Sequence, residues 1–99
     1  MPSERIRLYE LMLVISPEAD DDGATAVQRI VELIASHEGN VSEQEQWGLR
    51  RLAYQIKGFH EGQYALIRFS LGSGQAQEIG RALVAAEDVL RHLLTIDER

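Results

Sequence analysis

A central tract of the chain combines cationic and aromatic side chains within a few residues of one another. It contains, in order, Trp47, Arg50, Arg51, Tyr54 and Lys57. Guanidinium and ammonium groups bind phosphate oxygens, and aromatic rings stack on unpaired bases. The tract therefore has the residue types of an RNA-contacting surface. In the alternative interpretation, the two arginines are solvated charges that protect an exposed strand, and Trp47 packs on the rim of a sheet.

Residue types that often build catalytic or metal sites are present without the spacing that such sites need. His37, His60 and His92 are widely separated, and the chain has no Cys. The acidic run 20–22 lacks the Gly and Glu positions of a calcium loop, so helix capping is the favoured interpretation. Gly72-Ser73-Gly74 lacks the longer glycine pattern and the Lys of a nucleotide loop. We therefore expect no enzymatic activity, no metal site and no cofactor.

Length and composition are typical of one small domain that covers residues 1–99. The chain has 99 residues and is 44% hydrophobic, which is enough for a core without disulfides or a metal. The absence of Cys fits a reducing cytoplasm, and the polar N-terminus does not resemble a signal peptide. The longest apolar run, 11–15, is much shorter than the ~20 residues of a membrane span. We expect a soluble, cytoplasmic protein.

Net charge limits how the chain could bind RNA. The formal value is −6, which argues against a general nucleic-acid binder because phosphate contacts depend on clustered Lys and Arg. The basic residues are grouped, however, at 5–7 and 50–57. Any RNA affinity must therefore come from a local patch, helped by a basic partner.

Hydrophobic periodicity predicts six elements in the order strand, helix, strand, strand, helix, strand. Their predicted ranges are 5–15, 24–38, 41–57, 63–71, 76–86 and 89–96. Gly48 predicts an irregularity in the second strand, and residues 58–62 a hairpin connection. The acids 20–22 and Ser73 are predicted to cap the two helices, with Gly39 ending the first.

This order predicts an α+β fold of the ferredoxin-like type. Split strand-helix-strand units form a four-stranded antiparallel sheet with two helices on one face. The other face is then uncovered. The side chains predicted there are Met12, Val14, Tyr64, Leu66 and Arg68. An exposed apolar and aromatic sheet face suggests a binding surface.

With this topology, the chain resembles the bacterial small-subunit ribosomal protein S6 family over essentially its whole length. The matching segments are Leu8-Tyr9-Glu10, Ser16-Pro17-Glu18, Trp47-Gly48-Leu49-Arg50-Arg51-Leu52-Ala53-Tyr54, Gly62-Gln63-Tyr64 and Glu87-Asp88-Val89-Leu90-Arg91. The third segment is the family's signature. Two departures are Gln55, where members usually have Pro, and Ala85-Ala86, where many have a basic or Asn residue.

The resemblance implies a structural role in the small ribosomal subunit. It implies binding to ribosomal RNA in the platform together with the basic ribosomal protein S18, as a heterodimer. The residues then expected to contact RNA or the partner are Arg7, Tyr9, Trp47, Arg50, Arg51, Tyr54, Lys57 and Arg91. A basic partner would explain how an acidic chain can work on RNA.

Two other functions fit the same topology. A self-associating regulatory module would dimerise through the open sheet face, using Met12, Val14 and Leu66. An acylphosphatase-like hydrolase would need an anion-binding loop with an Arg after the first strand. The loop 16–20 is acidic instead and would repel a phosphate, which argues against the hydrolase.

Overall fold

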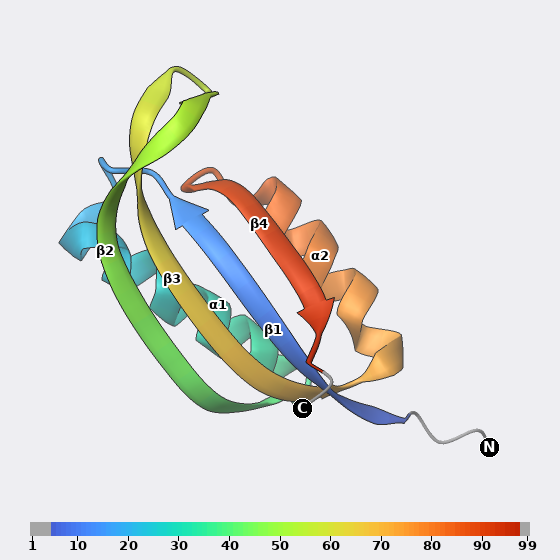
Figure 1. Ribbon diagram of the computed structural model, residues 1–99. Coiled ribbons are helices and arrows are strands. Elements are labelled where there is room, and N and C mark those ends of the chain that lie inside the picture. Colours follow the sequence, from blue (N-terminus) through green and yellow to red (C-terminus); the bar gives the residue numbers. More distant parts are fainter. Residues whose placement is uncertain (1–4, 98–99) are drawn as a thin grey trace.

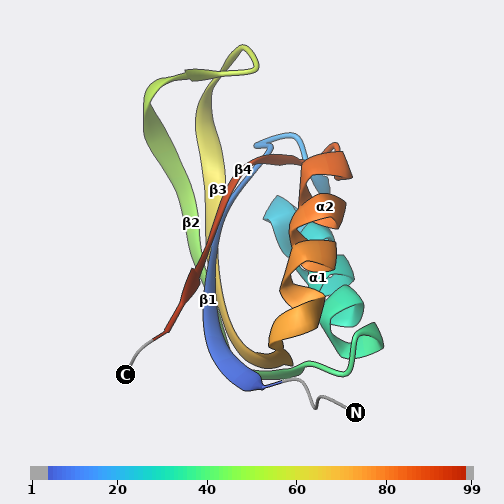
Figure 2. The ribbon, with the colours of Figure 1, turned by 90° about the vertical axis from the view of Figure 1, so that its right-hand side faces the viewer.

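Four strands form one antiparallel sheet, and two α-helices cover one of its faces (Figures 1 and 2). The structure is a computed structural model that describes residues 5–97. Its elements are β1 (Ile6–Ile15), η1 (Asp20–Gly23), α1 (Ala24–Ser36), β2 (Asn40–Ile56), β3 (Phe59–Gly72), η2 (Ser73–Gln75), α2 (Ala76–Ala85) and β4 (Val89–Ile96). The element order predicted from the sequence is confirmed.

The sheet order is β2-β3-β1-β4, so the first strand lies inside the sheet as its two-sided apolar pattern predicted. β1 pairs with β3 from Ile6 opposite Gly72 to Ile15 opposite Gln63. It also pairs with β4 on its other edge, and both pairings are antiparallel. The predicted ferredoxin-like α+β fold is confirmed. Within residues 5–97, the helices are too short or too polar for any of them to cross a membrane.

The hydrophobic core lies between the helix-covered face of the sheet and the two helices. Alternate positions of β1 and β3 point into it, because successive strand side chains leave opposite faces. The fully buried strand residues include Leu11, Leu13, Ile15, Ile67 and Phe69. Both helices complete the core with an apolar stripe at helical spacing: Val27, Ile30 and Ile34 on α1, Ile79 and Leu83 on α2.

The predicted aspartate cap of α1 is wrong. Asp21 and Asp22 belong to the 3-10 turn η1 and have left-handed backbone angles, with φ of 55° for each. The N-cap is Gly23, with φ of 91° and no side-chain cap hydrogen bond. The 3-10 turn η1 lies between these aspartates and α1, and their carboxylates make no hydrogen bond with the first N–H groups of the helix.

The end of α1 also differs from the prediction. The helix ends at Ser36, and the left-handed residue that follows is Glu38 with φ of 65°. Gly39 still closes the helix, because its N–H donates to the Ile34 carbonyl at 2.8 Å, and a Cβ there would lie 2.5 Å from the Ile34 side chain. Gly39 is therefore needed for the close approach of the chain to α1.

Ser73 does not cap α2 as predicted. It lies in η2, and the N-cap of α2 is Gln75. The Ser73 N–H donates to the carbonyl of Arg5 at 2.9 Å, which joins the start of η2 to the residue before β1. The intervening 3-10 turn moves the start of the helix beyond the reach of the serine.

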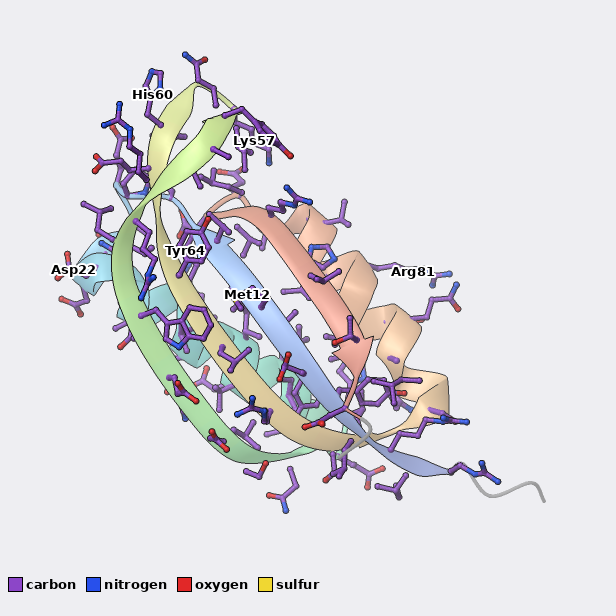
Figure 3. The ribbon with its side chains drawn as sticks, viewed as in Figure 1. Met12, Asp22, Lys57, His60, Tyr64 and Arg81 are labelled. Carbon is purple, nitrogen blue, oxygen red and sulfur yellow. The ribbon has the colours of Figure 1, made fainter. Side chains whose placement is uncertain are left out.

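Two of the apolar residues predicted on the open face of the sheet are buried. Val14 and Leu66 are only 6% and 4% exposed, and Met12 and Tyr64 are half-buried. Strand neighbours cover them: Val14 pairs with Tyr64 on one side and with Arg91 on the other. Figure 3 shows Met12 and Tyr64 on this face, opposite the helices. A self-associating module would therefore have to use Leu8 and Leu93, which are 50% and 61% exposed, in place of Val14 and Leu66.

Candidate nucleic-acid interface

β2 and β3 continue as a two-stranded arm, defined here as residues 49–62, beyond the end of β1. The last residue of β1, Ile15, pairs with Gln63, so the arm starts where the support of β1 ends. Figures 1 and 2 show the arm rising past the ends of both helices. All but one of the candidate residues of the central tract lie on this arm; Trp47 lies just before it.

The tip of the arm is a tight two-residue turn. Lys57 and Gly58 both have positive φ, 51° and 85°, which is the backbone of a type I′ hairpin turn. β3 therefore begins at Phe59, four residues before the predicted strand, and the predicted connection 58–62 is mostly strand. The turn places Lys57 at the outer end of the arm (Figure 3).

β2 has three register shifts against β3, and the two nearer the tip matter for the site. The first is at Gly48, as predicted, with φ of 87° and a register shift between Gln46 and Gly48. In the second, the register moves from Arg51 opposite Glu61 to Ile56 opposite Phe59, so residues 52–55 face His60 alone. Bulges of this kind redirect side chains away from the regular alternation.

Arg50 and Trp47 form a cation–π pair at the base of the arm. The Arg50 guanidinium lies 5.5 Å from the centre of the Trp47 ring. The Trp47 indole N–H donates to Glu45 Oε1 at 3.1 Å, and the side chain is 38% exposed. Trp47 is thus held on the surface, in contact with the cation that it would accompany in an RNA site.

Arg51 leaves the arm on the opposite side. Arg50 pairs with Gly62 and Arg51 with Glu61, and neighbouring strand residues point to opposite faces. Arg51, His60 and Glu61 line a shallow hollow of about 400 Å³. The two arginines therefore present their charges on two faces of one arm.

Tyr54 and Arg91 are brought together by the bulge. Tyr54 is 65% exposed, and its hydroxyl accepts a hydrogen bond from Arg91 Nη1 of β4 at 3.1 Å. The contact joins residues that are 37 positions apart in the sequence. The structure thus assembles Arg50, Arg51, Tyr54, Lys57 and Arg91 at one end of the molecule.

Arg7 and Tyr9 lie away from this assembly. Arg7 pairs with Leu71, which is nine residues along β3 from Gly62, the partner of Arg50; this is about 30 Å at ~3.3 Å per residue. Tyr9 is 6% exposed and stacks on Phe69 with 5.7 Å between ring centres. The position of Tyr9 in the core argues against the contact role predicted from the resemblance.

A charged network on the open face was not predicted. Arg68 of β3 contacts Glu10 at 2.9 Å, Glu43 at 2.7 Å, Glu45 at 3.7 Å and Asp97 at 3.7 Å. These acids come from β1, β2 and the end of β4, so the network crosses the whole sheet. The sequence signal for this network was the pair of acids at alternate positions of β2, Glu43 and Glu45, together with Arg68 on β3.

The network shifts the pKa of two residues, Glu45 and Arg68. The hydrogen bond from Trp47 lowers the pKa of Glu45, followed by a hydrogen bond with Glu43 and the charge of Arg68. For Arg68, desolvation acts to lower the pKa. The hydrogen bond to Glu10 and the charges of Glu43, Glu10 and Asp97 outweigh it, so the pKa is raised. One arginine shared by four carboxylates leaves this part of the surface negative.

The open face is therefore divided by charge. Cations lie on and beside the arm, and the acids around Arg68 extend from Glu45, beside Trp47 at the base of the arm, toward the other end of the face. Between them is a small, mostly apolar hollow of about 210 Å³, lined by Met12, Val14, Tyr64, Arg91, His92 and Leu93. Within residues 5–97, no three His, Asp or Glu side chains are grouped to hold a metal ion.

Comparison with known proteins agrees with this geometry. The family model described as Ribosomal protein S6 matches residues 8–95. The small ribosomal subunit protein bS6 of Moorella thermoacetica is 37% identical over 91 residues, covering 91% of this chain and 93% of the relative. The bS6 protein of Symbiobacterium thermophilum is 38% identical over 90 residues, covering 90% and 95%.

A solved structure supports the same assignment. The crystal structure of 30S ribosomal protein S6 from Thermotoga maritima superimposes with a TM-score of 0.87 at 27% identity, covering 94% of this chain and 89% of the other. Sequence and fold thus agree over nearly the full length. The chain belongs to the ribosomal protein S6 family, a family of structural proteins of the small ribosomal subunit and not of enzymes.

Proposed function

We propose that this protein binds small-subunit ribosomal RNA through the arm, in the platform, as a heterodimer with the basic ribosomal protein S18. Its place of action is then the ribosome in the cytoplasm. The protein would act by position: it neutralises phosphates at one point and presents a folded surface to its partner. The observation that carries the proposal is the projecting arm with cations on both faces.

The arm suits an RNA backbone. Arg50, Arg51 and Lys57 are exposed, and the arm extends beyond the acidic body of the protein (Figure 2). Charges on such a projection meet phosphates before the rest of the molecule does, which reduces repulsion from the net charge of −6. Trp47, already stacked with Arg50, adds an aromatic surface at the base of the arm.

The acidic part of the open face suits a basic partner. Glu10, Glu43, Glu45 and Asp97 share the single positive charge of Arg68. Their excess negative charge would attract cationic side chains of a partner and keep RNA at the arm. A joint complex would therefore show a larger cationic surface to RNA than this chain does alone.

The test is RNA binding by a charge-reversed arm. We expect Arg50→Glu/Arg51→Glu to weaken binding of the partner-bound protein to platform RNA by at least about tenfold. The slope of log K against log salt should also become shallower, by ~0.7–0.9 for each phosphate that the arm no longer neutralises. The matched control is Arg29→Glu/Arg81→Glu on the helices. It makes the same change in net charge at exposed arginines away from the arm.

The two variants separate local binding from overall charge. Equal reductions of affinity in both would mean that only net charge matters, and would remove the arm as the RNA site. The partner is tested by titrating S18 against wild-type protein and against Glu43→Lys/Glu45→Lys. If the acidic-site variant binds S18 as well as wild type does, the assigned partner surface is wrong.

A further inference from the structure

The orientation of the arm depends on a contact outside the hairpin. Beyond Gln63, the arm is a two-stranded ribbon without β1 beside it. Two-stranded hairpins are at best marginally stable in water when nothing packs against them. The bulge at residues 52–55 loosens this ribbon further, because it interrupts the ladder between Arg51 and Ile56.

The base of the arm is held by packing. Gly62 lies against β1 so closely that a Cβ would be 2.5 Å from a Val14 methyl and 3.3 Å from the Ile15 carbonyl oxygen. The same position is 3.9 Å from the Leu52 side chain. These contacts secure the ribbon where it leaves the sheet, but they do not reach its outer half.

The outer half of the arm contacts β4 through Tyr54 and Arg91. The bulge carries Tyr54 toward β4, where its hydroxyl accepts from Arg91 Nη1 at 3.1 Å. Arg91 also lines the small apolar hollow with Met12, Val14 and Leu93, so its stem is supported by the sheet. A planar guanidinium on a supported stem is a better defined anchor than a mobile ammonium.

We propose that Arg91 is a positioning residue: through its hydrogen bond to Tyr54, it holds the arm over the start of β4 and so sets the direction of Arg50, Arg51 and Lys57. The orientation of the arm is a property of the isolated protein. Its consequence for RNA affinity rests on the proposed function, and the two are tested separately.

The first test measures the arm in the isolated protein. Since the chain has no Cys, Ala53→Cys on the outer half of the arm and Gln77→Cys on α2 give two unique spin-label sites, both exposed. We expect one narrow distance distribution in this background, and a clearly broader one after Tyr54→Phe or Arg91→Met. Combining both substitutions should broaden it no further, because they remove the same bond.

Matched controls remove the same groups elsewhere. Tyr64→Phe deletes a tyrosine hydroxyl from the same sheet face, and Arg81→Met deletes an exposed arginine on α2. Both should keep the narrow distribution. Arg91→Lys keeps a charged donor and should restore part of the narrowing that Arg91→Met removes. Unchanged distributions in both Tyr54→Phe and Arg91→Met would overturn the positioning role.

The second test uses RNA. Tyr54→Phe changes no charge, so a direct phosphate contact by Arg91 would survive it. If Arg91 acts through Tyr54, Tyr54→Phe should lower RNA affinity by about threefold, the scale of one modest hydrogen bond, and Arg91→Lys should lower it by less because the lysine keeps a donor. If Tyr54→Phe and Arg91→Lys bind RNA as wild type does and only the loss of charge in Arg91→Met weakens binding, the positioning role is refuted. Failure of the wild-type protein to bind RNA would instead refute the proposed function and leave the distance result intact.

Discussion

Arg68 binds one carboxylate oxygen of Glu10 through two of its nitrogens, with Nε at 3.1 Å and Nη2 at 2.9 Å from Oε2. Its remaining nitrogen, Nη1, lies 2.7 Å from Glu43. The side chain is 21% exposed and joins the three strands β1, β2 and β3 on the open face. A single cation thus stabilises a surface that would otherwise consist of neighbouring carboxylates.

Replacing this cation should destabilise the fold. We expect Arg68→Met to lower the free energy of unfolding, because four carboxylates then repel one another without a shared counter-charge. The effect should be smaller in high salt, which screens exposed charges. Urea unfolding at low and high salt measures both effects. Adding Glu43→Gln to Arg68→Met should recover part of the stability; a further decrease would show that repulsion is not the cause.

The lowered pKa of Glu45 predicts acid sensitivity. The folded protein holds this carboxylate ionised below its ordinary pKa of 4.5, mainly through the Trp47 hydrogen bond. Its contribution to stability is therefore complete above that pH and is lost as pH falls through the lowered folded value. Glu45→Gln should flatten the acid side of a plot of unfolding free energy against pH. Glu32→Gln on α1 is the control, and an equal flattening there would contradict the assignment.

Gly62 should tolerate no side chain. We expect Gly62→Ala to lower the free energy of unfolding by about 1–3 kcal/mol, since its Cβ would overlap a Val14 methyl next to rigid backbone. Gly80→Ala is the matched control in α2, where nothing lies within 4 Å of the added Cβ. That change should stabilise by up to ~1 kcal/mol. Similar values for the two variants in chemical denaturation would rule out the steric explanation.

Tyr9 should act through the core. We expect Tyr9→Leu to lower the free energy of unfolding by about 1–3 kcal/mol, because it removes the ring stacked on Phe69. RNA affinity, measured where the variant is fully folded, should equal that of wild type. A selective decrease in RNA affinity would restore the contact role that the family resemblance implied for this residue.

Secondary structure was predictable where the pattern is local and repeated. The apolar stripe at Val27, Ile30 and Ile34 specifies a helix, and the two-sided apolar run of β1 specifies an interior strand. The caps were predicted less well. Asp21 and Ser73 are typical N-cap residue types, but 3-10 turns separate them from the helices, and sequence does not show such turns.

The candidate site was predictable in its residue types and only partly in its geometry. Arg50, Arg51 and Lys57 are close together in sequence, so any β-hairpin brings them together. Tyr9 has the same residue type as Tyr54, yet one is in the core and the other is on the arm. Tyr9 lies on the helix-covered face of the sheet, whereas Tyr54 lies in the bulge of the arm, beyond the part of the sheet that β1 supports.

Local sequence was thus sufficient for the order of elements, the ferredoxin-like fold and the position of a cationic, aromatic tract between Trp47 and Gly58. These depend on periodicity and on residue types within a few positions. The contacts of Arg68 with Glu10 and of Arg91 with Tyr54 depended on tertiary structure, because they join residues 58 and 37 positions apart. Strand pairing decides which distant side chains meet. Here it makes the tract part of a projecting arm and places Arg91 of β4 against Tyr54 on that arm.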